Sequence, residues 1–238
     1  TLKCNLAIED ADALFGRPMG IPKTGVFGLY DLIGIDLMAD VVVSLGNILP
    51  ADDAFHAVGA ANPAIAAMIE AGFTGDKGKG GFYCLEGTRR MARQFAGFDG
   101  NDMPPLKPAK TKLPAAAIAA AEAAARQDEP LFLLLDGHDD QAKFCRRVLG
   151  RILHYAASLV PSVTTTPQDI DDAMKLGFNW QRGPFEMIDA IGPQRFAALL
   201  DECDLTIPAF LEDGAPNYSV QAGTLMVRHA DGARQPVN

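Results

Sequence analysis

The sequence predicts an all-α protein made of two related helical domains joined by a proline-rich linker. Three observations lead to this fold class. Alanine is abundant and runs of β-branched residues are few, which favours helix over strand. Apolar residues recur at helical spacing in both halves of the chain. One motif also occurs twice, as GFNWQRGPFEMIDAIG at residues 177–192 and in a looser form, GRPMGIPKTGVFGLYDLIG, at residues 16–34.

The first half predicts two helices that meet at a glycine. Apolar residues keep helical spacing through residues 28–48, and Gly34 interrupts the run. Asp36 follows the glycine, so we expect it to cap the second helix. Another short helix is predicted over residues 63–70, where turn residues end it.

The glycine cluster GDKGKGGFY at residues 75–83 closes the first half. Lys77 and Lys79 could approach an anion there. No strand precedes the cluster, so the favoured interpretation is a compact turn that brings Phe82 and Tyr83 into the core.

The middle of the chain predicts a linker. The stretch FDGNDMPPLKPAKTKLP is rich in proline and lysine and has almost no periodicity. A helix is expected after it, over residues 115–127. The predicted organisation is therefore a first domain at residues 1–96, a linker with one helix at residues 97–140, and a second domain at residues 141–238.

The clearest helix of the second half carries an apolar residue at every fourth position from Phe144 to Val160. Its other face holds Lys143, Arg147, Arg151 and His154. That basic stripe could touch an acidic ligand, although a solvated helix face is the favoured interpretation. For the next helix, Thr166 is predicted to be the N-cap, Pro167 the first residue, and Gly177 the end.

The two halves match residue by residue around the repeated motif. EDADAL corresponds to QDIDDAM, and three further pairs share one offset: Phe27 with Phe185, Asp31 with Asp189, and Gly34 with Gly192. In the second copy, Gly183-Pro184 followed by Glu186 is typical of a helix start. In the first copy Thr24 is expected to do the capping. A phosphate-binding loop is the weaker interpretation, because neither copy places a GxGxxG between a strand and a helix.

The composition of the chain argues against several classes of function. The net charge of −9 argues against nucleic-acid binding. The four cysteines show no CxxC spacing, so we expect reduced, mostly buried thiols in a cytoplasmic protein, without a membrane span. The histidines lack metal-ligand spacing.

His138 lies among Asp136, Asp139 and Asp140, which could bind a cation but are expected to form a solvated loop. Asp171 and Asp172 are expected at an exposed helix end. The residue types alone show no complete catalytic set.

The motifs nevertheless resemble a known family. DIDDAMKLGFNWQRGPFEMIDAIG, residues 169–192, looks like the helical C-terminal domain of 3-hydroxyacyl-CoA dehydrogenases, whose typical pattern is a D-I-D-x-A-M helix followed by G-F-x-x-x-x-G-P-F-E-x-x-D-x-x-G. The first copy, residues 9–36, is similar to a variant with Gly-Arg-Pro and Lys in place of Gly-Pro-Phe-Glu. MIEAGFTGDKGKGGFY, residues 68–83, resembles that domain's usual ending.

Two such domains in tandem imply a multifunctional fatty-acid β-oxidation protein in which the dehydrogenase comes first and an enoyl-CoA hydratase module follows. The resemblance implies oxidation of 3-hydroxyacyl-CoA to 3-oxoacyl-CoA. It also implies that NAD, a Rossmann domain and a catalytic His–Glu pair lie upstream of Thr1, so that the chain is a fragment, inactive alone, that binds no cofactor or metal. The chain is then expected to form the wall on the substrate side and to pack the domains together. The best candidates for substrate contact are Lys23, Thr24 and Phe27.

The same resemblance separates the two copies. An Asn-Arg pair usually opens the first long helix, and the Asn helps hold the substrate carbonyl. Arg146-Arg147 takes that place in the second copy, which is therefore expected to be non-catalytic and to pack like a dimer partner. Two alternatives stay open: a purely structural or dimerisation module, and the helical half of another hydroxyacid dehydrogenase, such as the 6-phosphogluconate type, which shares the broad architecture.

Overall fold

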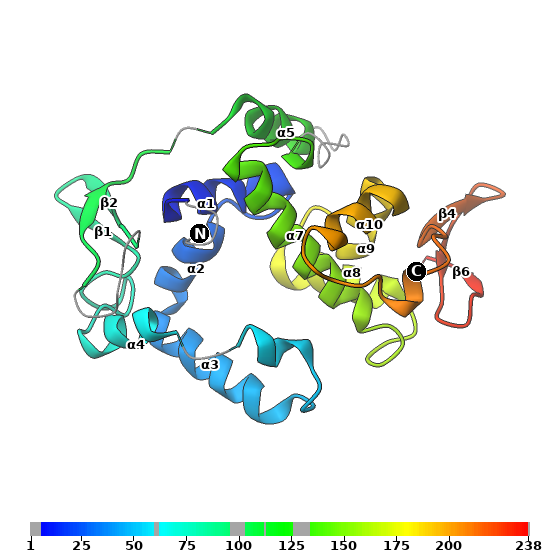
Figure 1. The fold of residues 1–238 in the computed structure, drawn as a ribbon, viewed down its shortest axis with the longest axis horizontal. Coiled ribbons are helices and arrows are strands. Elements are labelled where there is room, and N and C mark those ends of the chain that lie inside the picture. The colour runs from blue at the N-terminus through cyan, green and yellow to red at the C-terminus, as the bar shows by residue number, and fades with distance from the viewer. Residues whose placement is uncertain (1–5, 60–61, 96–102, 112, 126–133, 238) are drawn as a thin grey trace. The chain divides into compact units, whose positions relative to one another are not determined.

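The computed structural model describes residues 6–59, 62–95, 103–111, 113–125 and 134–237. The chain divides into two compact units. The first unit contains Thr1–Phe15 and Lys23–Leu113, and the second contains Gly16–Pro22 and Pro114–Asn238. Both units are mainly helical, which confirms the predicted fold class (Figure 1). Each also holds a small sheet that the sequence analysis did not anticipate.

Four helices and a short 3-10 turn form the helical part of the first unit. They are α1 (Ile8–Leu14), α2 (Gly25–Ile33), α3 (Ile35–Ile48), η3 (Ala54–Ala57) and α4 (Pro63–Glu70). The predicted break at Gly34 is confirmed, because this residue has a φ of 116° and lies between α2 and α3. The predicted cap is wrong: Asp36 lies inside the first turn of α3 and pairs instead with Lys77, with 2.8 Å between Nζ and Oδ1.

The sheet of the first unit is antiparallel, with strand order β1-β2-β3. Its strands are β1 (Tyr83–Glu86), β2 (Arg89–Arg93) and β3 (Leu106–Pro108). The third strand falls in the stretch that the sequence analysis interpreted as linker.

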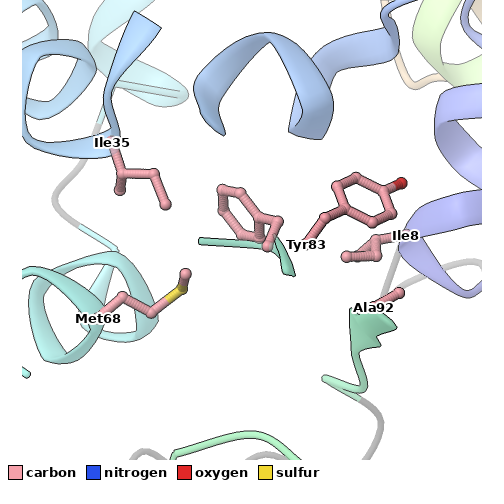
Figure 2. Close-up of a cluster of buried hydrophobic side chains, with 6 residues drawn as sticks. Ile8, Ile35, Met68, Tyr83 and Ala92 are labelled. Carbon is pink, nitrogen blue, oxygen red and sulfur yellow. The ribbon is translucent and has the colours of Figure 1, made fainter. Parts of the chain in front are cut away.

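The core of the first unit lies between the sheet and the helices. It contains Ile8, Ile35, Met68, Phe82, Tyr83 and Ala92. Figure 2 shows the side chains of Ile35, Met68 and Tyr83 converging from α3, α4 and β1 on one interior. The turn at residues 75–83 therefore brings Phe82 and Tyr83 into the core, as predicted.

The second unit is built around a long amphipathic helix. Its helices are α5 (Ala115–Ala125), α7 (Asp140–Ser158), α8 (Pro167–Phe178), α9 (Pro184–Ile191), α10 (Pro193–Asp201), and the 3-10 helices η2 (Arg17–Met19) and η4 (Ala209–Leu211). α7 buries the predicted apolar face, including Phe144, Leu149 and Leu153, against α9 and α10. The last two residues of the helix predicted over 115–127 lie outside the described residues.

Local sequence explains the ends of α8. Thr166 is its N-cap, as predicted, and the side chain accepts a hydrogen bond from the Gln168 amide. The predicted end at Gly177 is wrong, because the helix continues to Phe178 and closes on Asn179 in the left-handed conformation.

Three short strands complete the second unit. They are β4 (Tyr218–Gln221), β5 (Thr224–Arg228) and β6 (Arg234–Pro236), and they pair in the same antiparallel order as the first sheet. The duplication therefore includes the sheets as well as the helical motif.

Candidate functional site

A buried carboxylate fixes the start of the repeated helix in the first unit. Asp12, on α1, accepts hydrogen bonds from the backbone amides of Phe27 (2.8 Å) and Gly28 (2.9 Å) and from the hydroxyl of Tyr83 (2.9 Å). The prediction that Thr24 caps this helix is wrong, because its side chain makes no capping bond. Asp12 does the capping from another helix, and it also holds the first residue of β1.

A second carboxylate ties α2 to the same strand. Asp31 accepts hydrogen bonds from the amides of Phe82 (2.8 Å) and Tyr83 (2.7 Å). Burial raises the pKa of the Asp31 carboxyl to about 6, against the opposing effect of these two hydrogen bonds. Two carboxylates thus hold opposite ends of Tyr83.

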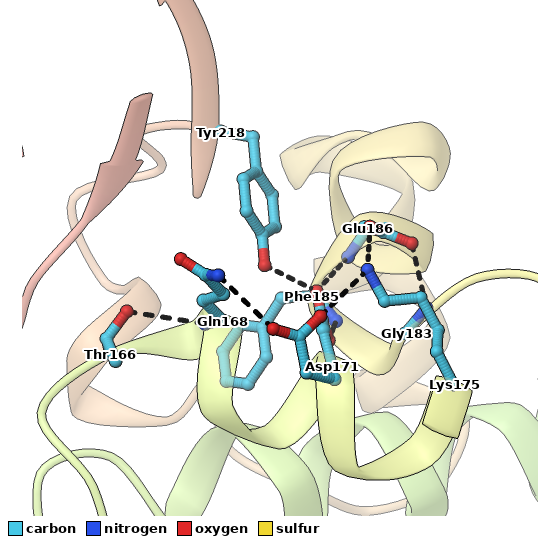
Figure 3. Close-up of polar contacts among 9 residues, drawn as sticks. Thr166, Gln168, Asp171, Lys175, Gly183, Phe185, Glu186 and Tyr218 are labelled. Atoms are coloured by element: carbon cyan, nitrogen blue, oxygen red, sulfur yellow. Dashed lines mark hydrogen bonds and ion pairs between the residues drawn. The ribbon is translucent and has the colours of Figure 1, made fainter. Parts of the chain in front are cut away.

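The second unit repeats this arrangement (Figure 3). Asp171 accepts hydrogen bonds from the amides of Phe185 (2.8 Å) and Glu186 (3.1 Å) and from the hydroxyl of Tyr218 (2.8 Å). Asp189 accepts from the amides of Asn217 and Tyr218. We call each Asp–Asp–Tyr set a carboxylate clamp.

The clamp corrects one expectation from the sequence. Asp171 was expected at an exposed helix end, yet its side chain is completely buried, whereas its neighbour Asp172 remains half-exposed. Burial raises the pKa of the Asp171 carboxyl to about 7, although the amides of Phe185 and Glu186 and the Tyr218 hydroxyl act in the opposite direction.

The glycine of the repeated motif lets the helix approach the clamp. A Cβ on Gly183 would lie 2.2 Å from the Asp171 Cβ, and one on Gly25 would lie 2.4 Å from the Asp12 Cβ. In the second copy the Glu186 carboxylate also accepts a hydrogen bond from the Gly183 amide (2.9 Å). The favoured interpretation, a loop-to-helix joint, is confirmed.

Most backbone amides of the glycine cluster at residues 75–83 already donate hydrogen bonds within the chain. In the loop at residues 75–83, the Gly75 amide donates to Gly80, the Gly81 amide to Tyr83, and the Phe82 and Tyr83 amides to Asp31. A phosphate-binding loop needs free amides at a helix N-terminus, and these four amides are not available for that role.

The three residues predicted to contact substrate lie at the start of α2. Lys23 and Thr24 are exposed, and Phe27 is partly buried with its ring edge-on to Phe82 at 4.9 Å between centroids. Their role in substrate contact stays a prediction.

A cavity of about 510 Å³ lies beside the first clamp, and the sequence analysis did not find it. Asp31, Lys79, Tyr83, Cys84 and Arg90 contribute to its wall. The Arg90 guanidinium stacks over the Tyr83 ring, 3.8 Å from its centroid. Because β1 and β2, which carry Tyr83, Cys84 and Arg90, were not predicted, no sequence signal pointed to this grouping.

The other candidate residues have structural roles. Asp139 is the N-cap of α7, and Asp136 pairs with Arg195. Within the described ranges no group of His, Cys, Asp or Glu could hold a metal ion, and no helix is long and apolar enough to cross a membrane. Cys145 and Cys203 are buried, as expected, while Cys84 is half-buried.

The first unit leaves one helical surface uncovered. Its α2 and α3 expose apolar side chains that we call the α2–α3 face: Val26, Leu29, Ile33, Leu37 and Val41. Their exposed fractions lie between 36% and 48%. Four of these residues have repeat partners that are buried in the second unit: Pro184, Met187, Ile191 and Leu199.

The comparisons with known proteins agree with this duplicated architecture. The family model described as "3-hydroxyacyl-CoA dehydrogenase, C-terminal domain" matches residues 2–84 and again residues 144–227. No solved structure matched the chain.

Curated relatives include two with printed names of a fatty acid oxidation complex. The chain is 35% identical over 195 residues to a "putative fatty acid oxidation complex trifunctional enzyme" of Rickettsia felis, covering 82% of this chain and 25% of that protein. It is 32% identical over 202 residues to the protein of the same name from Rickettsia prowazekii, covering 84% and 26%. It is 27% identical over 214 residues to a "probable 3-hydroxyacyl-CoA dehydrogenase" of Bacillus subtilis, covering 89% and 26%.

The chain therefore spans about a quarter of the length of these relatives. The family model covers both copies of the motif, and both copies build the same clamp. On these grounds the chain belongs to the family of 3-hydroxyacyl-CoA dehydrogenase C-terminal domains, which it carries twice.

Proposed function

We propose that this chain is the helical part of an NAD-dependent 3-hydroxyacyl-CoA dehydrogenase of cytoplasmic fatty-acid β-oxidation. The full protein would oxidise 3-hydroxyacyl-CoA to 3-oxoacyl-CoA, with NAD and the catalytic His–Glu pair held by a Rossmann domain outside these 238 residues, and with an enoyl-CoA hydratase module as a further part. The 238 residues shape the substrate side and the packing of the domains. Family membership and the names of the relatives support this proposal.

The single observation that carries the proposal is the α2–α3 face. Leu29 is 37% exposed and Val41 39% exposed, whereas their repeat partners Met187 and Leu199 are 1% and 3% exposed. Met187 and Leu199 lie on α9 and α10, and in the second unit α7 packs on these two helices. We infer that another helix of the full protein covers the α2–α3 face in the same way, since an apolar surface of this kind is stabilised by burial.

The second unit supports a division of labour. By the resemblance, Arg146 takes the place of the family's substrate-binding Asn, and its guanidinium is held on two of its nitrogens: it donates to the carbonyls of Leu135 (2.7 Å) and Gly137 (2.6 Å) and pairs with Glu202 (2.6 Å). A side chain held in this way serves structure. We therefore propose that the first copy contributes to the substrate wall, through Lys23, Thr24 and Phe27, and that the second copy is a packing module.

We keep the predicted organisation as part of the proposal, with domains at residues 1–96 and 141–238 and a connecting segment at residues 97–140. The approach of the two copies in the full protein would then imitate a dimer.

The proposal is tested by comparing the full-length protein with the 238-residue chain. With acetoacetyl-CoA and NADH, we expect the full-length protein to consume NADH, and the chain alone to give no turnover. We also expect no tight NAD binding by calorimetry, because the proposal assigns NAD to a Rossmann domain outside these 238 residues. Turnover by the chain alone, or a micromolar Kd for NAD, would contradict the proposal.

A further inference from the structure

The second unit contains a cavity of about 440 Å³ with no assigned role. It lies between α9, α10, η4 and the approach to β4, and Ile188, Phe196, Leu211 and Ala215 form part of its apolar wall. A cavity of this volume, with mostly apolar walls and a few polar groups, is typical of a small-molecule site.

The duplication explains why the cavity exists. Asp31 binds the amides of Phe82 and Tyr83, and Asp189 binds the amides of Asn217 and Tyr218. Asn217 therefore takes the position of Phe82. In the first unit the Phe82 ring fills the core, whereas the second unit has only a short amide at the same place.

A shorter helix in the second unit also leaves fewer side chains to fill the same region. α4 is an eight-residue helix whose Met68 side chain is completely buried in the core of the first unit (Figure 2). After the corresponding Pro-Ala pair, Pro208-Ala209, the second unit has only the three-residue helix η4. The second copy thus lacks the two large side chains, those of Phe82 and Met68, that the first copy packs into its core.

One lining residue of the cavity has a buried polar atom that lacks a partner. Asn217 is completely buried, and its Nδ2 donates to Asp189 Oδ1 at 2.8 Å. Its Oδ1 finds no hydrogen-bond partner anywhere in the described part of the chain. A buried acceptor without a donor is costly, so a bound molecule that donates a hydrogen bond would be stabilised there.

The remaining polar wall selects the charge of such a molecule. Asp189, Gln194 and Glu212 line the cavity, and its lining contains no lysine, arginine or histidine. Carboxylates disfavour an anion, and they tolerate a neutral or cationic donor.

We propose that this cavity binds a small, mainly apolar molecule with one hydrogen-bond donor, such as an alcohol, a primary amide or an amine, and that the buried Asn217 side chain shifts to offer its Oδ1 to that donor. The site is independent of the proposed dehydrogenase function, because it lies in the copy that we assign to packing and excludes the anionic CoA moiety.

The experiment is a titration of the ¹⁵N-labelled 238-residue chain, followed by NMR, with four probes that share one ring: benzyl alcohol, benzylamine, toluene and benzoate. We expect shifts at Ala197, Ala215 and the Asn217 side-chain amide. Benzyl alcohol and benzylamine should bind about three- to tenfold more tightly than toluene, since one net hydrogen bond is gained, and benzoate should bind most weakly. Equal binding of benzyl alcohol and toluene, or no shifts up to the solubility limit, would overturn the proposal.

Two variants close the cavity by different routes. Asn217→Phe installs the side chain of the first copy and retains the backbone amide that donates to Asp189. Ala197→Leu enlarges another lining residue of the cavity without altering Asn217. Both should lose at least tenfold in affinity for benzyl alcohol.

Ala198→Leu is the matched control, because Ala198 is the exposed neighbour of Ala197 and does not line the cavity. It should bind like the wild type. If Asn217→Phe fails to fold, Ala197→Leu decides alone, and unchanged binding by that variant would refute the site.

Discussion

At the scale of single residues, the carboxylate clamps hold each copy together. Asp171 satisfies two amides at the start of α9 and the hydroxyl of Tyr218, so one side chain joins three elements. Asp12 does the same in the first copy. Each clamp therefore replaces the local cap that a Ser or Thr would provide.

The sequence predicted the motif but not the clamp. Asp171 stands beside Asp172, and a pair of carboxylates near the start of a helix is typical of a solvated surface. Helical periodicity marks apolar faces and gives no sign that a polar side chain turns inward. The repeat held a usable signal, because it retains an aspartate at Asp12 and Asp171 but has Ala13 in place of Asp172.

We predict that Asp171→Asn destabilises the chain by about 2–4 kcal/mol. The amide would direct an N–H₂ group at a backbone N–H and so lose an acceptor in a completely buried place. Urea unfolding measures the change in the free energy of unfolding. The control Asp172→Asn removes only a half-exposed partner of Lys175, and it should cost less than about 0.5 kcal/mol.

The same variant should show a pH dependence with a definite sign. The pKa of Asp171 is about 7 in the folded chain and about 4 in an unfolded one. Folding therefore favours the protonated carboxyl, and its stabilising effect is complete below pH 4 and lost as the pH rises through 7. The cost of Asp171→Asn should be larger at pH 5 than at pH 8, and the reverse order would contradict the assigned pKa.

At the scale of secondary structure, helices followed from the sequence and strands did not. α7 and α9 showed long apolar periodicity or clear starting residues, which short-range physics determines. β1 and β4 have four residues each, which is too short for a period-two pattern to be told from chance. Such hairpins exist because Asp31 and Asp189 bind their first amides, and these are contacts between residues far apart in sequence.

Replacing either of two glycines of the second copy by alanine should change the free energy of unfolding in opposite directions. Gly183→Ala places a methyl group 2.2 Å from the Asp171 Cβ, and it should cost about 2–3 kcal/mol of unfolding free energy. Gly177→Ala meets nothing within 4 Å and lies inside α8, so it should gain about 0.5–1 kcal/mol. Thermal unfolding of both variants checks the pair. A neutral Gly183→Ala would show that the close approach is not required.

At the scale of the whole molecule, the sequence was enough to predict the duplication. It was not enough to predict which segments of the chain belong to which unit. The offset of the repeated motif identified two copies, and the family model confirms them. Sequence order suggested contiguous domains, yet Gly16–Pro22 belongs to the second unit, where the Gln181 amide donates to the Gly20 carbonyl at 2.9 Å. A short loop that leaves its own copy has no signature in composition or periodicity.

A matched pair of substitutions tests the difference between the copies. Val41→Glu lies on the α2–α3 face and should cost less than about 1 kcal/mol in the 238-residue chain. Leu199→Glu, at the equivalent position, buries a charge where a Cβ on Gly150 of α7 would lie 2.4 Å from the Leu199 Cδ2, and it should cost more than about 3 kcal/mol. Urea midpoints of both variants provide the comparison.

In the full-length protein we expect Val41→Glu to become about as costly as Leu199→Glu, because the α2–α3 face would then be covered. If Val41→Glu stays harmless there, no helix covers that face, and the argument for the proposed function fails.

The clamps also set an order of events during protein synthesis. Tyr83 closes the first copy onto Asp12, a partner 71 positions earlier in the chain, and Tyr218 closes the second onto Asp171, 47 positions earlier. The amide donors of each aspartate leave the ribosome soon after it, but its last hydrogen bond has to wait for the tyrosine. Each clamp is therefore completed only when the first strand of its sheet has been synthesised.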